Sequence, residues 1–407
     1  MPTERLYYRD CQLIEFSARV IAHAAYGGRT AIVLDRTAFY PTSGGQPFDT
    51  GRLGDATVVD VVEGVEGILH VLEGPVPKVG TTVAGAIDQE RRVDHTQQHT
   101  GQHVLSQAFE RIGDFTTLSF HLGADASTID LDTPILDPAA VRQAEEVANQ
   151  IVLEDRPILI HFTDAQDVER FGLRKPAQKA GVPRTGEIRI VEVAGFDSSA
   201  CGGTHVSRTG QIGPIKVRRW ERRGTVSRVE FLCGWRALRD YAGRAETTRA
   251  LAERLSVADV DLLATVNRSL DDLERLRDDV SRLREQILEA EAARLVDRGQ
   301  PLKNLPSGRL VQQVYVGRSP DELKRLALTL VRTGPCVALL GSSGARCHVV
   351  FAQSTGLPFD MNQLLRQVAP LFGGRGGGSR DLAQGGAPNP GPVDTALTEA
   401  VRLLQAG

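Results

Sequence analysis

Histidine and cysteine residues recur at metal-ligand spacing in two parts of the 407-residue sequence. His95, His99 and His103 follow one another at intervals of four, and Cys201 and His205 are also four residues apart. Residues four apart lie on one face of a helix, so two of these imidazoles can reach one ion, whereas a third, another turn away, usually cannot. Thiolates and imidazoles are donors that zinc prefers, and tetrahedral sites are commonly assembled from two such pairs. The spacing therefore predicts a zinc site with one ion per chain.

The chemistry of such a site is not settled by its donors. Thr100 follows His99, where the helix of a zinc metalloprotease carries its glutamate base. Four protein ligands would also close a tetrahedral site, whereas hydrolytic zinc normally keeps one position open. The ion could be structural, could position a substrate, or could expand its coordination during a reaction.

The composition is that of a globular protein. Hydrophobic residues make up 41% of the chain and charged residues 24%, and the formal net charge is −3. No apolar run reaches the roughly 18 residues of a membrane span, and five scattered cysteines are too few for a disulfide framework. We therefore expect a cytoplasmic protein with no membrane partner.

One short segment is strongly basic. Five of the eight residues from Lys216 to Arg223 are lysine or arginine, and Trp220 lies among them. Such a segment is either a phosphate-binding face or the solvated face of a strand. Arg218 and Arg219 are its candidate phosphate contacts.

The first half of the chain changes character near residue 90. Short β-branched runs separated by turns, notably the glycine-rich turn Pro41–Pro47, predict a small barrel or sandwich over residues 1–90. Asp94, with Gln97 at the capping-box position, is the candidate start of a helix that ends near Gly113. A second helix is expected to begin at Asp137–Pro138, and strands follow, so residues 91–250 read as α+β.

The second half combines a heptad helix with a further domain. Val266, Leu273, Val280 and Ile287 recur every seven residues, which predicts a long coiled-coil-like helix over residues 256–299. Its seam must pack on another helix or on a neighbouring domain, so a homodimer through this helix is one expectation. Residues 305–407 read as α/β, with strands near 310–316, 336–341 and 346–352. A helix-like stretch and a glycine-rich turn, expected to be structured, follow over residues 362–379.

The motifs around these residues resemble those of a known family. His99–Ser106, Ser119–Gly123 and Ser199–His205 are similar to the editing domain of alanyl-tRNA synthetases, and Thr37–Gln46 to its glycine-rich element. Phe372–Gly378 resembles the DHH-associated domain at the synthetase C-terminus. The order of motifs matches from residue 30 to residue 390. The resemblance identifies His99 and His103, rather than His95, as the helical ligand pair beside Cys201 and His205.

The resemblance implies a stand-alone alanyl-tRNA editing protein of the long form. With the barrel beginning at residue 1, we expect no class II aminoacylation domain. The fold would be multi-domain α+β: a small β-barrel, an α+β zinc-binding editing domain, the long heptad helix and a C-terminal α/β DHH-associated domain. Its partner would be tRNA(Ala) mischarged with serine or glycine, whose ester it would hydrolyse in trans. The resemblance also implies that the C-terminal domain could contact tRNA and mediate a homodimer.

Roles for further residues follow from the same resemblance. Thr37 could bond the hydroxyl of a serine substrate or merely cap a turn, and Gln46 could contact the substrate. The remaining candidates are Gly44, Gly45 and His121 for substrate binding, and Arg218, Arg219, Arg375 and Arg380 for tRNA binding.

Two alternatives stay open. The closed ligand count also fits an RNA-binding module with a structural zinc. The substrate could instead be another mischarged tRNA such as Ser-tRNA(Thr), since threonyl-tRNA synthetases carry a related editing domain.

Overall fold

The computed structural model describes residues 3–65, 67–175, 187–303, 305–389 and 391–406. The chain divides into two compact units, Met1–Arg254 and Leu255–Gly407. The mixed α+β, multi-domain class expected from the sequence is confirmed. Across the described residues, no helix combines the length and apolarity that crossing a membrane requires.

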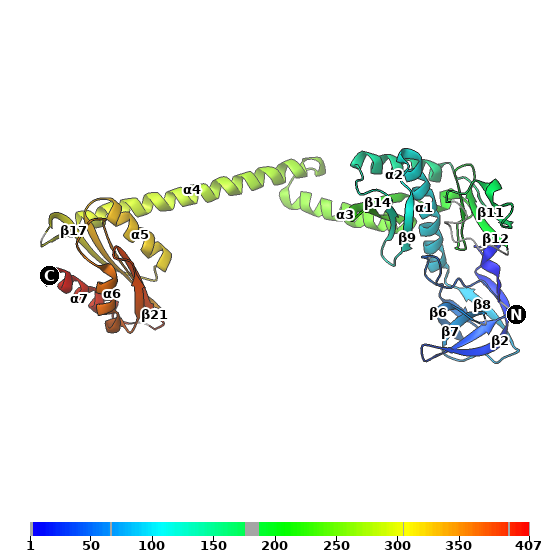
Figure 1. Cartoon of the computed structure of the whole chain (residues 1–407), viewed down its shortest axis with the longest axis horizontal. Coiled ribbons are helices and arrows are strands. Elements are labelled where there is room, and N and C mark those ends of the chain that lie inside the picture. Colours follow the sequence, from blue (N-terminus) through cyan, green and yellow to red (C-terminus); the bar gives the residue numbers. More distant parts are fainter. Residues whose placement is uncertain (1–2, 66, 176–186, 304, 390, 407) are drawn as a thin grey trace. The chain divides into compact units, whose positions relative to one another are not determined.

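The first unit begins with a closed barrel of antiparallel strands. Its order is β2-β3-β7-β6-β5-β8, with bounds β2 Glu15–Tyr26, β3 Arg29–Leu34, β5 Gly51–Leu53, β6 Ala56–Gly64, β7 Gly67–Glu73 and β8 Thr82–Ile87 (Figure 1). Two short strands, β1 Glu4–Arg5 and β4 Arg36–Thr37, pair in parallel beside it. The interior is filled by alternating apolar side chains such as Val20, Ile32 and Val58, as period-two strands require.

Helix α1, Gln89–Gly113, leaves the barrel and carries half of the candidate site. Its N-cap is Asp88, whose side chain accepts a hydrogen bond from the Arg91 amide. The prediction that Asp94 caps this helix is wrong, because Asp94 lies inside it and pairs with Arg236. The buried Arg92 side chain ties α1 to the barrel: its Nη2 lies 2.5 Å from Asp49 Oδ2.

The rest of the first unit packs two sheets around α1 and α2, Pro138–Leu153. Asp137 and Pro138 open α2 as predicted. One sheet has the order β14-β15-β10-β9 and the other β11-β12-β13. The bounds are β9 Thr117–Leu122, β10 Ser127–Leu131, β11 Ile158–Thr163, β12 Ile188–Val193, β13 Asp197–Ala200, β14 Ile215–Arg223 and β15 Val226–Cys233. Helix α3, Gly234–Leu255, follows β15.

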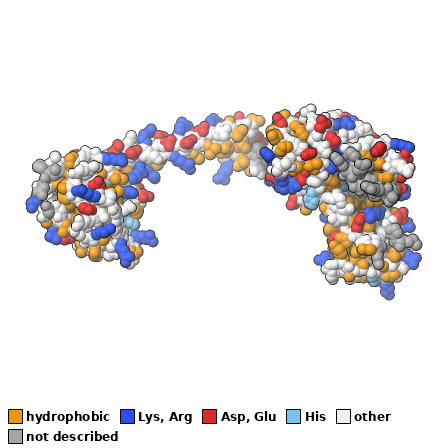
Figure 2. All heavy atoms as spheres, viewed as in Figure 1, with side chains coloured by type: hydrophobic (Ala, Val, Ile, Leu, Met, Phe, Trp, Pro, Cys, Tyr) orange, Lys and Arg blue, Asp and Glu red, His pale blue; other side chains and the backbone are white. Residues whose placement is uncertain are grey.

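The second unit begins with the heptad helix α4, Leu262–Asp297. It starts later than the predicted residue 256, because Ser256 adopts a positive φ of 54° that breaks the helix after α3. The seam residues Val266, Leu273, Val280 and Ile287 are exposed, whereas Ala292 near the C-terminal end is buried. Acidic and basic side chains crowd the visible surface of α4 (Figure 2).

The C-terminal domain is a six-stranded sheet covered by helices. Its order is β16-β17-β18-β19-β21-β20, and only the β17–β18 pair is parallel among the described pairings. The bounds are β16 Gln300–Leu302, β17 Leu305–Val316, α5 Pro320–Arg332, β18 Cys336–Ser343, β19 Cys347–Gln353, α6 Met361–Val368, β20 Arg375–Gly378, β21 Leu382–Ala387 and α7 Val393–Ala406. The glycine-rich segment is ordered as the edge strand β20, rather than as a loop.

Candidate metal centre

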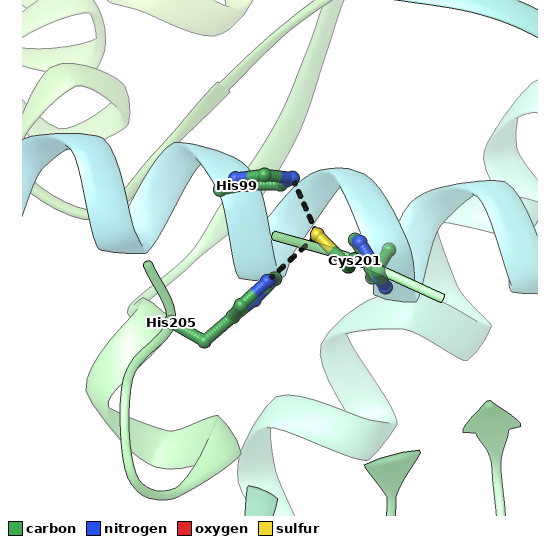
Figure 3. Close-up of side chains that lie close together, drawn as sticks. His99, Cys201 and His205 are labelled. Carbon is green, nitrogen blue, oxygen red and sulfur yellow. Dashed lines mark hydrogen bonds between the residues drawn. The ribbon is translucent and has the colours of Figure 1, made fainter. Parts of the chain in front are cut away.

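The four predicted ligands meet at one point of the first unit. His99 and His103 lie one turn apart on α1, and Cys201 and His205 lie on the turn that follows β13. One donor atom from each lies within 4.8 Å of the others. Cys201 Sγ is 3.4 Å from His99 Nε2 and 3.3 Å from His205 Nε2, and Figure 3 shows the two rings converging on the sulfur.

These separations fit a tetrahedral zinc ion. Zinc binds sulfur at about 2.3 Å and imidazole nitrogen at about 2.0–2.1 Å, so two such donors of a tetrahedron lie about 3.6 Å apart. The observed Sγ–Nε2 distances are within a few tenths of an ångström of that value. The donor set, three imidazoles and one thiolate, is also one that zinc favours.

Each ligand imidazole is held through its other nitrogen. The Nδ1 atoms lie 2.7 Å from Gln46 Oε1 (His99), 3.1 Å from Asp197 Oδ2 (His103) and 3.2 Å from Thr100 Oγ1 (His205). Such partners fix the tautomer and ring orientation of metal-bound histidines. All three rings are therefore arranged to offer Nε2 to a shared ion.

Gln46 connects the barrel end of the chain to both ligand segments. Its Oε1 accepts hydrogen bonds from His99 Nδ1 and, at 3.1 Å, from the Thr204 amide, while its Nε2 donates to Thr204 Oγ1 at 2.8 Å. Because the Thr204 backbone amide can only donate, the Gln46 side-chain atom that faces it must be the oxygen. The same oxygen faces His99 Nδ1, so Nδ1 carries the proton and is the donor. Gln46 is fully buried and does not line the pocket described below. Its contacts are therefore with the His99 ring and with Thr204.

The charge states of the cluster suit a divalent cation. Burial opposes ionisation of the Cys201 thiol, but the imidazoles of His99 and His205 hold its pKa well below its usual range. Burial lowers the pKa of His205 to about 3, so this ring is neutral. Burial also acts against a charge on His103, but its hydrogen bonds to Asp197 and Cys201 raise its pKa to about 9. A bound cation would replace the proton that His103 otherwise shares with the sulfur.

Asp197 was not predicted from the sequence, although it lies four residues before Cys201. Its buried carboxylate accepts from His103 Nδ1 and, at 2.8 Å, from Arg174 Nε. Burial raises the pKa of Asp197, but His103 and Arg174 lower it further, so the carboxylate stays charged. The carboxylate–histidine pair is the arrangement that strengthens a metal-bound imidazole.

Gly203 allows the two ligand segments to approach each other. A Cβ added to it would lie 2.1 Å from His99 Cε1 and 2.9 Å from Gln46 Oε1. No real Cβ contact is that short, so any side chain here would displace the His99 ring. Gly203 thus has a steric role that its place in the Cys201–His205 turn does not reveal.

A pocket of about 330 Å³ opens on the cluster. This volume lies at the small end of ligand pockets. Besides His99, His103 and Cys201, the wall consists of Tyr40, Ser43, Gly44, Gln102, Thr117, Phe120, Arg174, Lys175, Ser199, Ala200, Gly202 and Gly203. His121 is exposed on β9 and is absent from this wall, where its neighbour Phe120 takes the place expected for it.

The glycine-rich element reaches the pocket only in part. Gly44 lines it, and the Gly45 carbonyl accepts from the Leu122 amide at 3.0 Å, which joins the element to β9. Thr37 does not line it: its hydroxyl lies 2.8 Å from His70 Nε2 in the barrel and accepts from the Phe39 amide. Thr37 therefore lies outside the described lining of this pocket, and its hydroxyl caps the turn at Phe39.

The four arginines expected to bind tRNA lie on two different units. Arg218 and Arg219 are on β14 and form ion pairs with Glu230, which compensates part of their charge. In the second unit, Arg375 is exposed on the edge strand β20, and Arg380 donates to the carbonyls of Phe359 and Pro358. None of the four lines the pocket.

Comparison with known proteins gives consistent matches. Residues 182–230 match the family model described as the threonyl and alanyl tRNA synthetase second additional domain, and residues 3–91 match that of tRNA synthetases class II (A). The chain is 32% identical to the alanyl-tRNA editing protein AlaX-L of Pyrococcus horikoshii, over 94% of either chain.

Longer proteins match as well. The chain is 34% identical to the alanine–tRNA ligase of Methanopyrus kandleri and 32% identical to that of Pyrococcus abyssi. These alignments cover 100% and 99% of this chain, but only 45% and 44% of the ligases. The chain thus spans about half the length of the ligases it matches.

Proposed function

The chain belongs to the family of alanyl-tRNA editing proteins and alanine–tRNA ligases, and we propose that it is a zinc-dependent hydrolase of mischarged tRNA(Ala). The observation that carries the proposal is the His99–His103–Cys201–His205 cluster at the base of a small pocket. The reaction is hydrolysis of the ester that joins serine, or glycine, to the terminal ribose. Water adds to the carbonyl carbon, and the ribose oxygen leaves with a proton.

The chain's own residues provide positioning and a sheltered pocket. The three histidines and Cys201 would hold one zinc ion, which supplies polarisation of the ester carbonyl, a lowered pKa of bound water, or a fixed point for the substrate. Gln46 and Asp197 hold two of the ligand rings through Nδ1. Phe120 and Tyr40 line the pocket and keep bulk water away from the ester.

The pocket favours an enzyme over a purely structural zinc site. A structural zinc needs no access, whereas His99, His103 and Cys201 all contribute to the wall of this pocket. With His99, His103, Cys201 and His205 as donors, a bound zinc would serve either as a Lewis acid that can take one more ligand or as a fixed point for the substrate.

A deacylation assay tests the proposal. The purified chain is incubated with Ser-tRNA(Ala), Gly-tRNA(Ala), Ala-tRNA(Ala) and Ser-tRNA(Thr), with Cys201→Ala in parallel. We expect hydrolysis of Ser-tRNA(Ala) or Gly-tRNA(Ala), sparing of Ala-tRNA(Ala), and loss of activity in the variant. Preference for Ser-tRNA(Thr) would support the threonyl alternative. RNA binding without hydrolysis of any of the four would support the structural-zinc alternative.

We also propose that α4 pairs with a second copy of the chain, in parallel. When the heptad is numbered so that Val266, Leu273, Val280 and Ile287 occupy position a, two aspartates occupy position g and two arginines occupy position e. The aspartates are Asp272 and Asp279, and the arginines are Arg277 and Arg284. In a parallel pair g faces e of the partner helix, so opposite charges meet. In an antiparallel pair g faces g, and like charges meet.

A further inference from the structure

The pocket beside the metal cluster has a distinctly cationic side. Arg174 and Lys175 both line it, and no aspartate or glutamate is among the described residues of its wall. Asp197, which is not part of the wall, pairs with Arg174 Nε at 2.8 Å, so the cationic side consists of Lys175 and the remaining edge of the Arg174 guanidinium. A pair of cations at one wall of a small cavity indicates an anionic ligand.

Arg174 is held rigidly. Its backbone amide donates to the Ser198 carbonyl at 2.8 Å, its Nε donates to Asp197 Oδ1 at 2.8 Å, and its Nη2 donates to Ser199 Oγ at 3.4 Å. The side chain is only 6% exposed. Among the described residues Nη1 has no hydrogen-bond partner, so part of the planar donor fork remains available.

Lys175 lies next to it, and within the part of the chain that the structure describes its Nζ makes one hydrogen bond. Its Nζ donates to the Leu118 carbonyl at 3.3 Å, and an ammonium group has three donors. Besides Asp197, which pairs with Arg174, Glu110 acts on both cations; burial raises the pKa of Glu110, and its Oε2 has no hydrogen-bond partner among the described residues. Glu110 is also not part of the pocket wall, so it does not occupy the place of an anion there.

The chemistry of the proposed substrate identifies the anion. An aminoacyl ester has no free carboxylate, and its amino group is positively charged and would be repelled by two cations. The only negative groups near the ester are the phosphates of the RNA, of which the 5′-phosphate of the terminal nucleoside is nearest. We propose that Arg174 and Lys175 form a phosphate subsite that binds this 5′-phosphate and thereby places the esterified ribose oxygen at the metal cluster.

The subsite rests on the proposed function for its substrate, but it can be tested separately. Two pairs of compounds differ only in the phosphate: seryl-adenosine 5′-monophosphate against seryl-adenosine for hydrolysis, and adenosine 5′-monophosphate against adenosine for binding. Wild type, Lys175→Ala and Lys78→Ala are compared. Lys78 is the matched control, because it is an exposed lysine of the same unit outside the pocket.

The quantity measured is the preference for the phosphate, which is the ratio of kcat/KM, or of Kd, within each pair. We expect wild type and Lys78→Ala to prefer the phosphorylated compound by roughly tenfold or more, as for a charge-assisted hydrogen bond. Lys175→Ala should lose most of that preference through KM. Arg174→Lys should retain part of the preference for the phosphate, because lysine keeps the positive charge but lacks the planar pair of guanidinium donors.

Three outcomes would overturn the subsite. They are a wild-type preference near one, an unchanged preference in Lys175→Ala, and an equal fall of kcat on both esters, which would mean that Lys175 acts on the reacting carbonyl. If wild type binds the monophosphate with a Lys175-dependent preference but cleaves neither ester nor Ser-tRNA(Ala), the proposed function fails and the phosphate subsite stands.

Discussion

Replacing Gln46 by leucine should weaken metal binding although none of the four metal ligands is replaced. Leucine cannot accept the hydrogen bond from His99 Nδ1 at 2.7 Å or the one from the Thr204 amide at 3.1 Å. Two buried donors would lose their acceptor, and the His99 ring would lose the partner that selects its tautomer. We expect zinc affinity to fall by about 10- to 100-fold, the range for loss of such a partner, which corresponds to about 1.4–2.7 kcal/mol.

A neighbouring glutamine provides the control. Gln98 is also fully buried on α1, and its amide exchanges two hydrogen bonds with the backbone of Cys233, 3.0 Å each, without contacting a ligand. Gln98→Leu should therefore lower the free energy of unfolding by an amount similar to Gln46→Leu, about 1–3 kcal/mol for each buried group left unpaired. It should leave zinc affinity close to that of wild type.

The assay is competition for zinc against a chromophoric chelator, followed by denaturant unfolding of the same samples. Gln46→Glu adds a second comparison, because a carboxylate keeps both acceptor bonds and should retain most of the affinity. Wild-type affinity in Gln46→Leu, or an equal loss in Gln98→Leu, would refute the role assigned to Gln46.

Three further outcomes are expected. Burial lowers the pKa of His70 from 6.5 to about 4, so as the pH falls the unfolded chain takes up a proton on His70 before the folded chain does. The free energy of unfolding should therefore fall by about 3 kcal/mol between pH 6.5 and 4. Denaturant unfolding should show a smaller fall in His70→Leu. Gly203→Ala should abolish zinc binding by displacing His99, whereas Gly202→Ala, whose Cβ would contact the Tyr8 side chain with the hydroxyl nearest at 3.3 Å, should not. Replacing Leu276 and Leu283 by aspartate should convert a dimer into a folded monomer in sedimentation equilibrium, and a persistent dimer would count against pairing through α4.

The ligand set could be predicted because each pair is local in the sequence. His99 and His103 share a helix face, and Cys201 and His205 share a turn, so spacing predicts that each pair can reach one ion. Spacing does not separate the pair His99 and His103 from the pair His95 and His99, and the resemblance of the flanking motifs made that choice. The start of α1 could not be predicted, because the helix buries Arg92, His95 and other polar residues before Val104, and its first turns show no apolar periodicity.

The partners of the ligands were beyond what spacing can show. Gln46 and Asp197 lie 53 and 94 residues from the histidines that they contact, and only the fold brings them together. Thr37 shows the converse, because the family resemblance of the glycine-rich element suggested the pocket, whereas the Thr37 hydroxyl on β4 lies against His70 in the barrel. The direction of a short strand's side chains depends on pairing, which is set by distant residues.

The central claim is that the cluster holds a zinc ion on which deacylation depends. The most direct measurement is the rate of Ser-tRNA(Ala) hydrolysis by chelator-treated protein as zinc is added back, with bound zinc counted per chain. The rate should be close to background without metal and should rise to a plateau at one zinc per chain, with no rise in Cys201→Ala. Full activity of the metal-free protein, or no activity at one bound zinc per chain, would contradict the account.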